Sequence, residues 1–423
     1  MRASSSRRDF IKHVAAFAAV AGTARSFGQS TTSPAGANSR IGVGFIGTGG
    51  RSSAHLQAVQ WLKTQKKYPV QIVAACDVYR PRLQNVVKNF ECKGYSNHKD
   101  LLADPNVDVV CIATPDHLHG YQALDAVRAG KDVYCEKPVT HWKQFDLIKT
   151  LAAEVKKSGR VFQLGTQGMS DWAWHQAKEL IADGLIGQPI HAECGYFRVG
   201  DWGERGMPID NPSAKPGPDL DWDAFLGDAP KRPFDVSRFF RWRMYEDYAG
   251  GPCTDLFPHT LTPVVSMLGV SFPSVAVATG GMFRYTEREV PDTFNMLIDY
   301  PQKLTVAVLG TQGNNDPGAP VRSTGRCPVI RGWEGSLTFA TKEIIFTPAE
   351  GSKKKKQAFP IQHGEDFILH WESFLNNCRT KDQATFSPVE LAYHTQTALI
   401  MGAWSLKYGK VVKFDQRKQE IVM

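Results

Sequence analysis

The sequence predicts an α/β protein with two parts. Short apolar runs alternate with helical patterns between residues 41 and 165, which predicts a doubly wound parallel sheet. After residue 166, strand-like runs follow one another with few helices between them, which predicts an α+β domain with an open, largely antiparallel sheet. The composition agrees, because a chain of 423 residues with 42% hydrophobic and 22% charged residues is long and apolar enough for two cores.

The first 28 residues have the pattern of a twin-arginine export signal. Arg7 and Arg8 are followed by a short Ala/Val/Phe run and then by small residues suited to cleavage. The apolar run is about half of the roughly 20 residues that a membrane-spanning helix needs, so we expect no integral membrane span. Residues 29–40, rich in Ser, Thr, Pro and Gly, are predicted to be a linker. We expect export to the periplasm in a folded state; an amphipathic helix that begins at the two arginines is the alternative.

The charge and cysteine patterns argue against nucleic-acid binding and against a metal site. The net charge is +8, but about half of it lies in the leader, and no basic stripe interleaved with aromatic residues is present. The eight cysteines form no CxxC pair or other metal-ligand spacing. Cys76, Cys111 and Cys135 lie inside apolar runs, where small core residues are expected. The sequence does not indicate whether any of the eight cysteines form disulfides.

The first strand leads into a turn with the pattern of a dinucleotide site. The apolar run 41–46 is followed by Gly47, Thr48, Gly49, Gly50 and Arg51. A helical pattern comes next, and then a second strand, 70–76. Glycines allow a tight turn and a close backbone approach to a pyrophosphate, and the helix N-terminus supplies partial positive charge. Ser52 replaces the third glycine of this fingerprint. The pattern predicts a Rossmann domain over residues 41–165.

An acidic residue ends the second strand. Asp77 is expected to accept hydrogen bonds from the adenosine ribose hydroxyls and to repel a 2′-phosphate, which favours NAD. Arg80 lies three residues further on and keeps NADP open as an alternative.

The alternation continues to the end of this domain. The predicted helices are 82–89, 100–102, 120–129 and 144–158, and the predicted strands are 107–113, 132–135 and 161–164. In such sheets ligands bind beyond the carboxyl ends of the strands. The further cofactor-binding candidates there are Thr114, Pro115, His119, Glu136, Lys137 and Gln167.

Residues 166–415 are predicted to form the substrate and oligomerisation domain. The predicted helices are 172–183, 366–379 and 388–407, and the predicted strands are 189–198, 275–279, 293–299, 304–310, 336–340 and 343–347. A Pro/Asp/Gly-rich stretch, 201–234, is predicted to be a long loop of the kind that is usually functional or mobile.

Asp255 and His259 are the strongest catalytic candidates in this second part. On a helix they would share one face, where the carboxylate orients the imidazole. Pro258 removes one backbone donor, so a bent or late-starting helix is expected. Just upstream, Arg241, Trp242 and Arg243 are candidates for contacts with substrate hydroxyls or acidic groups.

These motifs together resemble those of the Gfo/Idh/MocA family, which includes glucose-fructose oxidoreductase and inositol dehydrogenase. The resemblance extends from residue 41 to about residue 415. It rests on the glycine turn, the run Ala113–His119, the Glu136-Lys137-Pro138 sequence, and Asp255 with His259 after a Gly-Gly pair. The family implies that Lys137 reaches both substrate and nicotinamide ribose, that His259 is the general acid/base, and that Asp255 holds substrate or histidine. It also implies a homo-oligomer formed through the open sheet.

The predicted function follows from this resemblance and from the residue chemistry. We expect an exported NAD(P)-dependent oxidoreductase that transfers a hydride between a tightly bound nicotinamide cofactor and a secondary hydroxyl of a sugar, polyol or sugar derivative. One alternative is a glycosidase or lyase that oxidises, eliminates and re-reduces with a recycled cofactor. Another is a sugar or nucleotide sensor without catalysis. Thr262 stands where many members of the family carry an acid, which leaves the substrate class open.

Overall fold

A computed structural model describes residues 40–200, 207–322 and 325–423. The predicted export signal and nearly all of the predicted linker lie outside these residues. The N-terminal sheet has six parallel strands in the order β3-β2-β1-β4-β5-β6. The strands are β1 (Ile41–Ile46), β2 (Val70–Cys76), β3 (Lys93–Tyr95), β4 (Val109–Ile112), β5 (Asp132–Glu136) and β6 (Phe162–Gly165). This is the doubly wound order of a Rossmann domain, so the predicted parallel sheet is confirmed.

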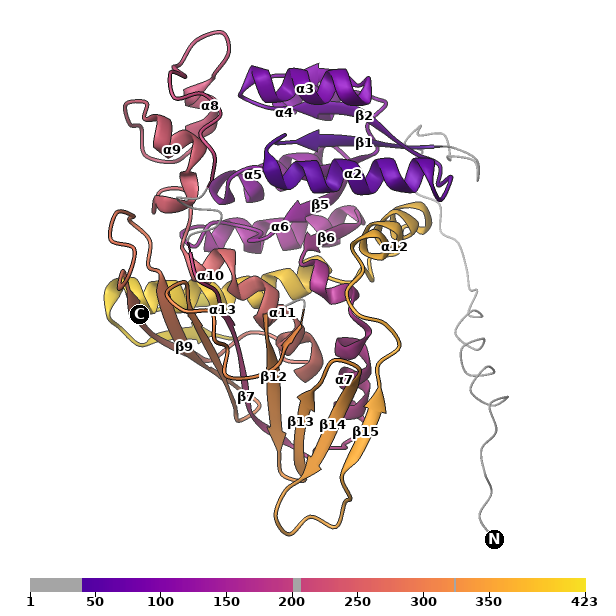
Figure 1. The fold of residues 1–423 in the computed structure, drawn as a ribbon, viewed down its shortest axis with the longest axis vertical. Coiled ribbons are helices and arrows are strands. Elements are labelled where there is room, and N and C mark those ends of the chain that lie inside the picture. The colour runs from indigo at the N-terminus through magenta and orange to yellow at the C-terminus, as the bar shows by residue number, and fades with distance from the viewer. Residues whose placement is uncertain (1–39, 201–206, 323–324) are drawn as a thin grey trace. The chain divides into compact units, whose positions relative to one another are not determined.

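Helices accompany the strands of this sheet (Figure 1). They are α2 (Gly50–Thr64), α3 (Arg80–Phe90), α4 (His98–Ala103), α5 (Asp116–Arg128) and α6 (Phe145–Ser158). Helix α5 begins at Asp116, four residues before the predicted start, because Pro115 takes the extended N-cap conformation that leads into a helix. His119 therefore lies in the first turn of a helix instead of in a loop.

The C-terminal sheet is mixed and mostly antiparallel. Its order is β15-β14-β13-β12-β7-β10-β9-β8-β16-β17, with β11 paired to β12, and β7 and β10 are its parallel pair. The strands are β7 (Pro189–Phe197), β8 (Val275–Gly281), β9 (Thr293–Tyr300), β10 (Leu304–Thr311), β11 (Val321–Arg322), β12 (Gly325–Gly332), β13 (Gly335–Phe339), β14 (Glu343–Pro348), β15 (Gln357–Pro360), β16 (Val412–Asp415) and β17 (Glu420–Val422). The sequence missed β11, β12 and β15–β17, which are short or interrupted by Pro and Gly.

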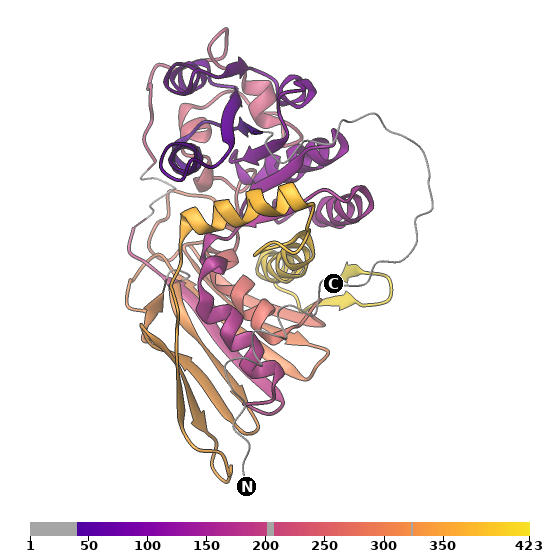
Figure 2. The same ribbon diagram turned by 90° about the vertical axis from the view of Figure 1, so that its right-hand side faces the viewer.

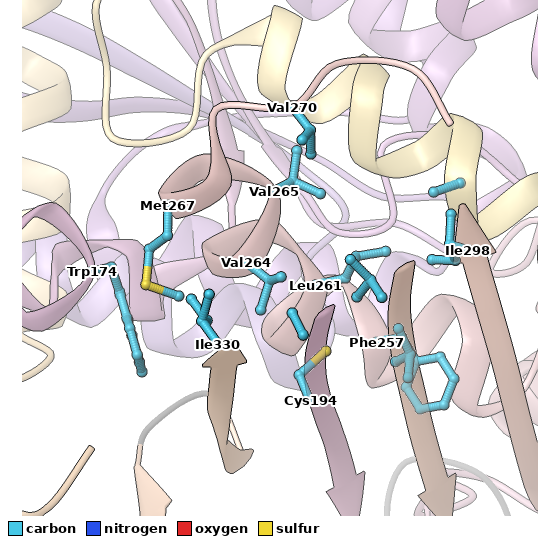
Figure 3. Packing of buried hydrophobic residues seen from close by; sticks show 14 of the residues in the cluster. Trp174, Cys194, Phe257, Leu261, Val264, Val265, Met267, Val270, Ile298 and Ile330 are labelled. Atoms are coloured by element: carbon cyan, nitrogen blue, oxygen red, sulfur yellow. The ribbon is translucent and has the colours of Figure 1, made fainter. Parts of the chain in front are cut away.

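Helices pack on one face of this sheet and close its core (Figure 2). They are α7 (Trp172–Ala182), which follows the short 3-10 helix η1 (Gln167–Ser170), then α11 (Phe257–Leu268) and α13 (Val389–Tyr408). Figure 3 shows Val264 of α11 between Trp174 of α7 and Leu261 of α11, with Cys194 of β7 below them, all four buried. This apolar layer holds the N-terminal end of α11, and thus His259, in place.

Helix α12 (Phe367–Thr380) belongs to the C-terminal part of the sequence but packs on the Rossmann domain. Trp371 and Phe374 are fully buried in one cluster with Val43, Phe45 and Tyr134. Residues 40–423 consequently make one compact unit. No helix in the described part of the chain is long and apolar enough to cross a membrane.

The prediction of a long loop over residues 201–234 is wrong for residues 222–226, which form a helix. Residues 207–249 contain α8 (Trp222–Leu226), α9 (Val236–Phe240) and the 3-10 helix η2 (Trp242–Met244). Asp221 and Asp235 cap the two α-helices by accepting backbone hydrogen bonds from Ala224 and Arg238. Single helical turns fixed by such caps are too short to produce a periodic apolar pattern. The short helix α8 therefore interrupts the expected loop, and α9 and η2 follow after its predicted end.

Candidate active site

A cavity of about 600 Å³ lies beyond the carboxyl ends of β1, β2, β4 and β5, within the size range of small-molecule and cofactor sites. Most of the predicted site residues line it. They are Gly47, Gly49, Gly50, Arg51, Asp77, Thr114, Pro115, His119, Glu136, Lys137, Trp242 and Arg243. Thr48, Gln167, Arg241, Asp255 and His259 do not line this cavity.

The glycine turn has the geometry that a pyrophosphate needs. Gly47 has φ +85°, and a Cβ there would lie 2.8 Å from the Ala113 carbonyl oxygen, so a side chain does not fit. Gly49 is the N-cap of α2 and offers no side-chain cap. The N–H groups at the start of α2 therefore remain available to an anionic ligand, as a dinucleotide requires.

Asp77 is held by the same turn. Its Oδ2 accepts hydrogen bonds from the backbone N and the Oγ1 of Thr48, both at 2.7 Å. Its Oδ1 accepts from the backbone N of Tyr79 at 2.8 Å. Thr48 thus positions Asp77, and Asp77 presents its carboxylate to the cavity, where an adenosine ribose would bind.

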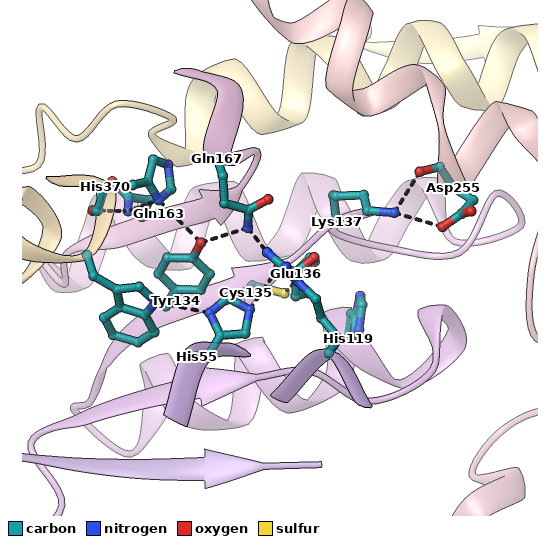
Figure 4. A network of polar contacts seen from close by, with 12 residues as sticks. His55, His119, Tyr134, Cys135, Glu136, Lys137, Gln163, Gln167, Asp255 and His370 are labelled. Carbon is teal, nitrogen blue, oxygen red and sulfur yellow. Dashed lines mark hydrogen bonds and ion pairs between the residues drawn. The ribbon is translucent and has the colours of Figure 1, made fainter. Parts of the chain in front are cut away.

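Glu136 also lines the cavity, and Figure 4 shows the polar network around it. One carboxylate oxygen, Oε1, accepts from Arg51 Nε at 2.8 Å, His55 Nε2 at 2.9 Å and Gln167 Nε2 at 2.8 Å. Burial alone would raise the pKa of Glu136, but the Arg51 charge and the His55 hydrogen bond outweigh it and hold the pKa well below its usual range. Gln167, predicted to bind cofactor, lies behind Glu136 and holds it.

Trp371 determines which nitrogen of His55 carries the proton. The indole Nε1–H is only a donor, and it lies 3.0 Å from His55 Nδ1, so Nδ1 is the acceptor. Burial lowers the pKa of His55, so the ring is neutral and its Nε2–H donates to Glu136. The sequence did not identify His55 or Trp371. The one signal was a histidine on the apolar face of the helix after the glycine turn.

Lys137 connects the cavity to Asp255. Its Nζ donates to Asp255 Oδ1 at 2.8 Å and to the Asp255 carbonyl oxygen at 2.6 Å. Arg198 and Arg243 approach the same carboxylate at 3.3 and 3.4 Å. Burial would raise the pKa of Asp255, but the charges of Lys137, Arg243 and Arg198 outweigh it and keep the carboxylate ionised.

The bent helix expected around Pro258 is present. Helix α10 (Pro252–Asp255) ends before Leu256, and α11 starts at Phe257. The carboxylate of Asp255 is directed to the three cations and makes no hydrogen bond with His259, unlike the pairing expected on a continuous helix. Within the described residues the His259 ring has no hydrogen-bond partner. Burial, reinforced by the Lys137 charge, lowers the pKa of His259 to about 3, so the imidazole is neutral.

Two residues of the Arg241-Trp242-Arg243 run face the cavity. The Arg243 guanidinium lies 4.2 Å from the centre of the Trp242 ring, a cation–π contact that holds both side chains on the cavity wall. Arg241 instead donates to the Met207 carbonyl oxygen at 3.0 Å. Trp242 and Arg243 thus line the cavity, whereas Arg241 is bonded to the backbone of Met207 outside the lining, and the predicted ligand contacts of all three stay predictions.

Asp116 is a buried acid that the sequence did not single out. It accepts a hydrogen bond from Thr254 Oγ1 at 3.1 Å and so ties α5 to α10. Burial, only partly offset by the charges of Arg243 and Lys137, raises its pKa to about 7.

With this geometry established, comparison with known proteins defines the class. Residues 41–166 match the model of the oxidoreductase family with an NAD-binding Rossmann fold, and residues 171–303 match the C-terminal alpha/beta domain of the same family. The two matches together cover more than half of the chain, so the chain belongs to the Gfo/Idh/MocA oxidoreductase family.

Named relatives match part of the chain. Inositol 2-dehydrogenase of Salmonella paratyphi B is 33% identical over 161 residues, which are 38% of this chain and 45% of the relative. Inositol 2-dehydrogenase 1 of Saccharopolyspora erythraea is 31% identical over 156 residues, which are 36% of this chain and 45% of the relative. The chain thus spans less than half of the length of the curated relatives it matches.

Solved structures share the whole fold. Levoglucosan dehydrogenase in complex with NADH and levoglucosan has a TM-score of 0.64 at 18% identity, covering 88% of this chain and 99% of that one. The WlbA dehydrogenase from Bordetella pertussis, in complex with NADH and UDP-GlcNAcA, has a TM-score of 0.63 at 17% identity, covering 89% and 99%. Both similarities show the fold that places the cavity at the strand ends.

Proposed function

We propose that the chain is an exported NAD-dependent oxidoreductase acting on a secondary hydroxyl of a sugar, polyol or sugar derivative. The observation that carries this proposal is the arrangement at the Glu136 end of the cavity. There the Lys137 ammonium is held by Asp255 Oδ1 at 2.8 Å, and the neutral His259 lies four residues after Asp255 in the first turn of α11. The inositol and levoglucosan dehydrogenases among the similar proteins support a polyhydroxy substrate.

Each residue has a chemical task in this proposal. A nicotinamide bound in the cavity supplies the hydride acceptor. The neutral imidazole of His259 takes the hydroxyl proton on a ring nitrogen, which a protonated ring cannot do. The ammonium of Lys137 stabilises the negative charge that develops on the substrate oxygen. Asp255 holds Lys137 in position, and Asp77 and the glycine turn hold the dinucleotide.

The test begins with protein recovered from the periplasmic fraction, which also examines export. Released cofactor is identified by mass spectrometry after denaturation, and reduction of NAD is followed at the nicotinamide absorbance with a panel of sugars and polyols. We expect His259→Ala to lower kcat by about 100-fold or more, the scale of lost general base catalysis, while NADH binding persists. Equal activity in the variant would refute the assignment of His259. His363→Ala, at an exposed position, is the matched control.

A redox-neutral variant of this chemistry is the second candidate, in which oxidation, elimination and re-reduction cleave a bond with a recycled cofactor. The lining of the cavity by residues of both the Rossmann domain and the segment 207–249 favours it, because a cofactor held between them is kept from one reaction cycle to the next. Bond cleavage without net NADH formation supports this candidate, whereas steady NADH accumulation supports a simple dehydrogenase. Ligand binding without turnover in the wild-type protein would instead support a sensor.

A further inference from the structure

Residues 207–249, here called the insert, lie between β7 and α10 and pack on the Rossmann domain. The insert has its own buried aromatic cluster, with Trp222, Phe225, Phe239 and Phe240 among its members. Tyr79, which follows β2 and Asp77, is the Rossmann residue buried in this cluster. Its ring centre lies 5.8 Å from that of Phe239 and 5.4 Å from that of Phe240, both edge to face. The segment after Asp77 is therefore built into the core of the insert.

Polar contacts join the same two segments. The backbone N of Arg80 donates to the Asp219 carbonyl oxygen at 2.9 Å, and the backbone N of Asp221 donates to the Val78 carbonyl oxygen at 3.0 Å. A third contact follows four residues after Asp221, where His117 Nε2 lies 2.8 Å from the Phe225 carbonyl oxygen. The insert is thus attached to the segment after β2 and to the first turn of α5.

Arg82 connects the insert to the glycine turn. Its Nε donates to Asp210 Oδ2 at 2.6 Å, and its guanidinium lies 5.3 Å from the centre of the Phe240 ring. The same guanidinium reaches the turn, because a Cβ on Gly49 would lie 3.3 Å from one of its nitrogens. Arg82 therefore spans from the predicted pyrophosphate position to the insert.

The cavity lies between these two walls. Glycine turn, Asp77 and Glu136 line it from the Rossmann domain. Met207, Ala224, Phe225, Phe239, Trp242 and Arg243 line it from the insert. An open Rossmann cleft has only the first wall, so a dinucleotide here would be covered along its outer side by apolar and aromatic groups.

We infer that the insert is the outer wall of the dinucleotide site and retains the bound cofactor, so that release requires the insert to separate from residues 78–82. This inference rests on the proposed function, because it needs NAD(H) as the occupant. It explains how an exported enzyme keeps a cofactor that is made in the cytoplasm. The contacts between the insert and residues 78–82 would then be the structural cause of the predicted tight binding of the cofactor.

The first test removes the Arg82–Asp210 ion pair by a change at Asp210, which does not line the cavity. NADH release is followed by nicotinamide fluorescence during a chase with excess NAD. Asp210→Asn is expected to release NADH about two- to fivefold faster, the scale of one partly exposed ion pair. Asp223→Asn is the control, because Asp223 pairs with Lys231 inside the insert and both side chains are exposed. Release from Asp210→Asn at the wild-type rate would overturn the retention role.

The second test needs no substitution. Amide hydrogen exchange is compared with and without saturating NADH, and we expect slower exchange over residues 207–249 and unchanged exchange over β13–β15. Unchanged exchange in the insert while NADH is bound would overturn the inference alone. Failure to bind NADH at all would instead overturn the proposed function together with it.

Discussion

Glu136 accepts all three of its hydrogen bonds on one carboxylate oxygen. Arg51, His55 and Gln167 all reach Oε1, whereas Oε2 has no hydrogen-bond partner among the described residues. Because Glu136 lines the cavity and stays ionised, Oε2 is an oriented acceptor for a donor on a bound ligand. The Glu136 carboxylate is thus held in place through Oε1, and its Oε2 can accept a hydrogen bond from a ligand.

The indole of Trp371 is expected to contribute to this immobilisation. Trp371→Phe removes the donor that keeps the proton of His55 on Nε2, so Glu136 loses one of its three donors for part of the time. We expect NADH affinity to fall about two- to tenfold, the value of one neutral hydrogen bond, measured by fluorescence titration after cofactor removal. Trp404→Phe is the control, because it loses an indole hydrogen bond to the Trp142 carbonyl oxygen, 3.1 Å away. Equal affinity in both variants would refute the role of Trp371.

At the scale of elements, the break between α10 and α11 sets the catalytic geometry. A continuous helix would direct the Asp255 carboxylate toward His259. The break at Leu256 instead directs this carboxylate to Lys137, and it makes no hydrogen bond with the His259 ring. Gly251 begins this unit with φ +64°, and a Cβ there would lie 2.5 Å from the Pro291 carbonyl oxygen. The Gly-Gly pair therefore fixes the path of the chain into α10.

Gly251→Ala is expected to lower both stability and turnover. An alanine at this positive φ costs about 1 kcal/mol of folding free energy. Its Cβ also collides with the Pro291 carbonyl oxygen, and this collision displaces Asp255. Gly269→Ala is the matched control, because Gly269 has φ +62° and open space around its Cβ position. We expect a larger fall in Tm and a loss of kcat for Gly251→Ala, and a small fall in Tm with normal kcat for Gly269→Ala. Equal effects of the two changes on Tm and kcat would contradict this account.

At the scale of the whole molecule, the two halves of the sequence share a core. Helix α12 comes after the second sheet but covers Val43, Phe45 and Tyr134 of the first one. The Rossmann domain consequently depends on a helix that lies more than 200 residues further along the chain. Self-association through the second sheet stays a prediction at this scale.

We expect a fragment of residues 41–166 not to fold as an independent domain. Without α12 the apolar surface that it covers is exposed. The loss of its buried aromatic side chains lowers the free energy of unfolding by several kcal/mol, about 3 to 5 for each large aromatic residue. The fragment should bind a hydrophobic dye and show no cooperative thermal transition, whereas the chain with its α12 should unfold in one transition by calorimetry. A fragment that unfolds cooperatively and binds NADH would contradict the shared core.

Local patterns were sufficient for the Rossmann sheet, the glycine turn, Asp77 and Glu136-Lys137, because each depends on neighbours in sequence: alternating strands and helices, glycine conformations, and residues at strand ends. His55 and Trp371 could not be paired in advance, since they are 316 residues apart and only the docking of α12 brings them together. Residues 207–249 were expected to be partly loop for a related reason, since their single turns are stabilised by contacts with Tyr79 and Arg82.

The sequence by itself thus determined the class of fold, the NAD-binding domain and the place of the glycine turn, Asp77 and Lys137 at the ends of its strands. Only the tertiary structure decided which side chains support these groups: Gln167 and Trp371 behind Glu136, Arg243 at Asp255, and the insert across the cavity. The physical reason is that turn and strand chemistry is local, whereas desolvation, ion pairing and the walls of a cavity depend on segments that meet only when the chain has folded.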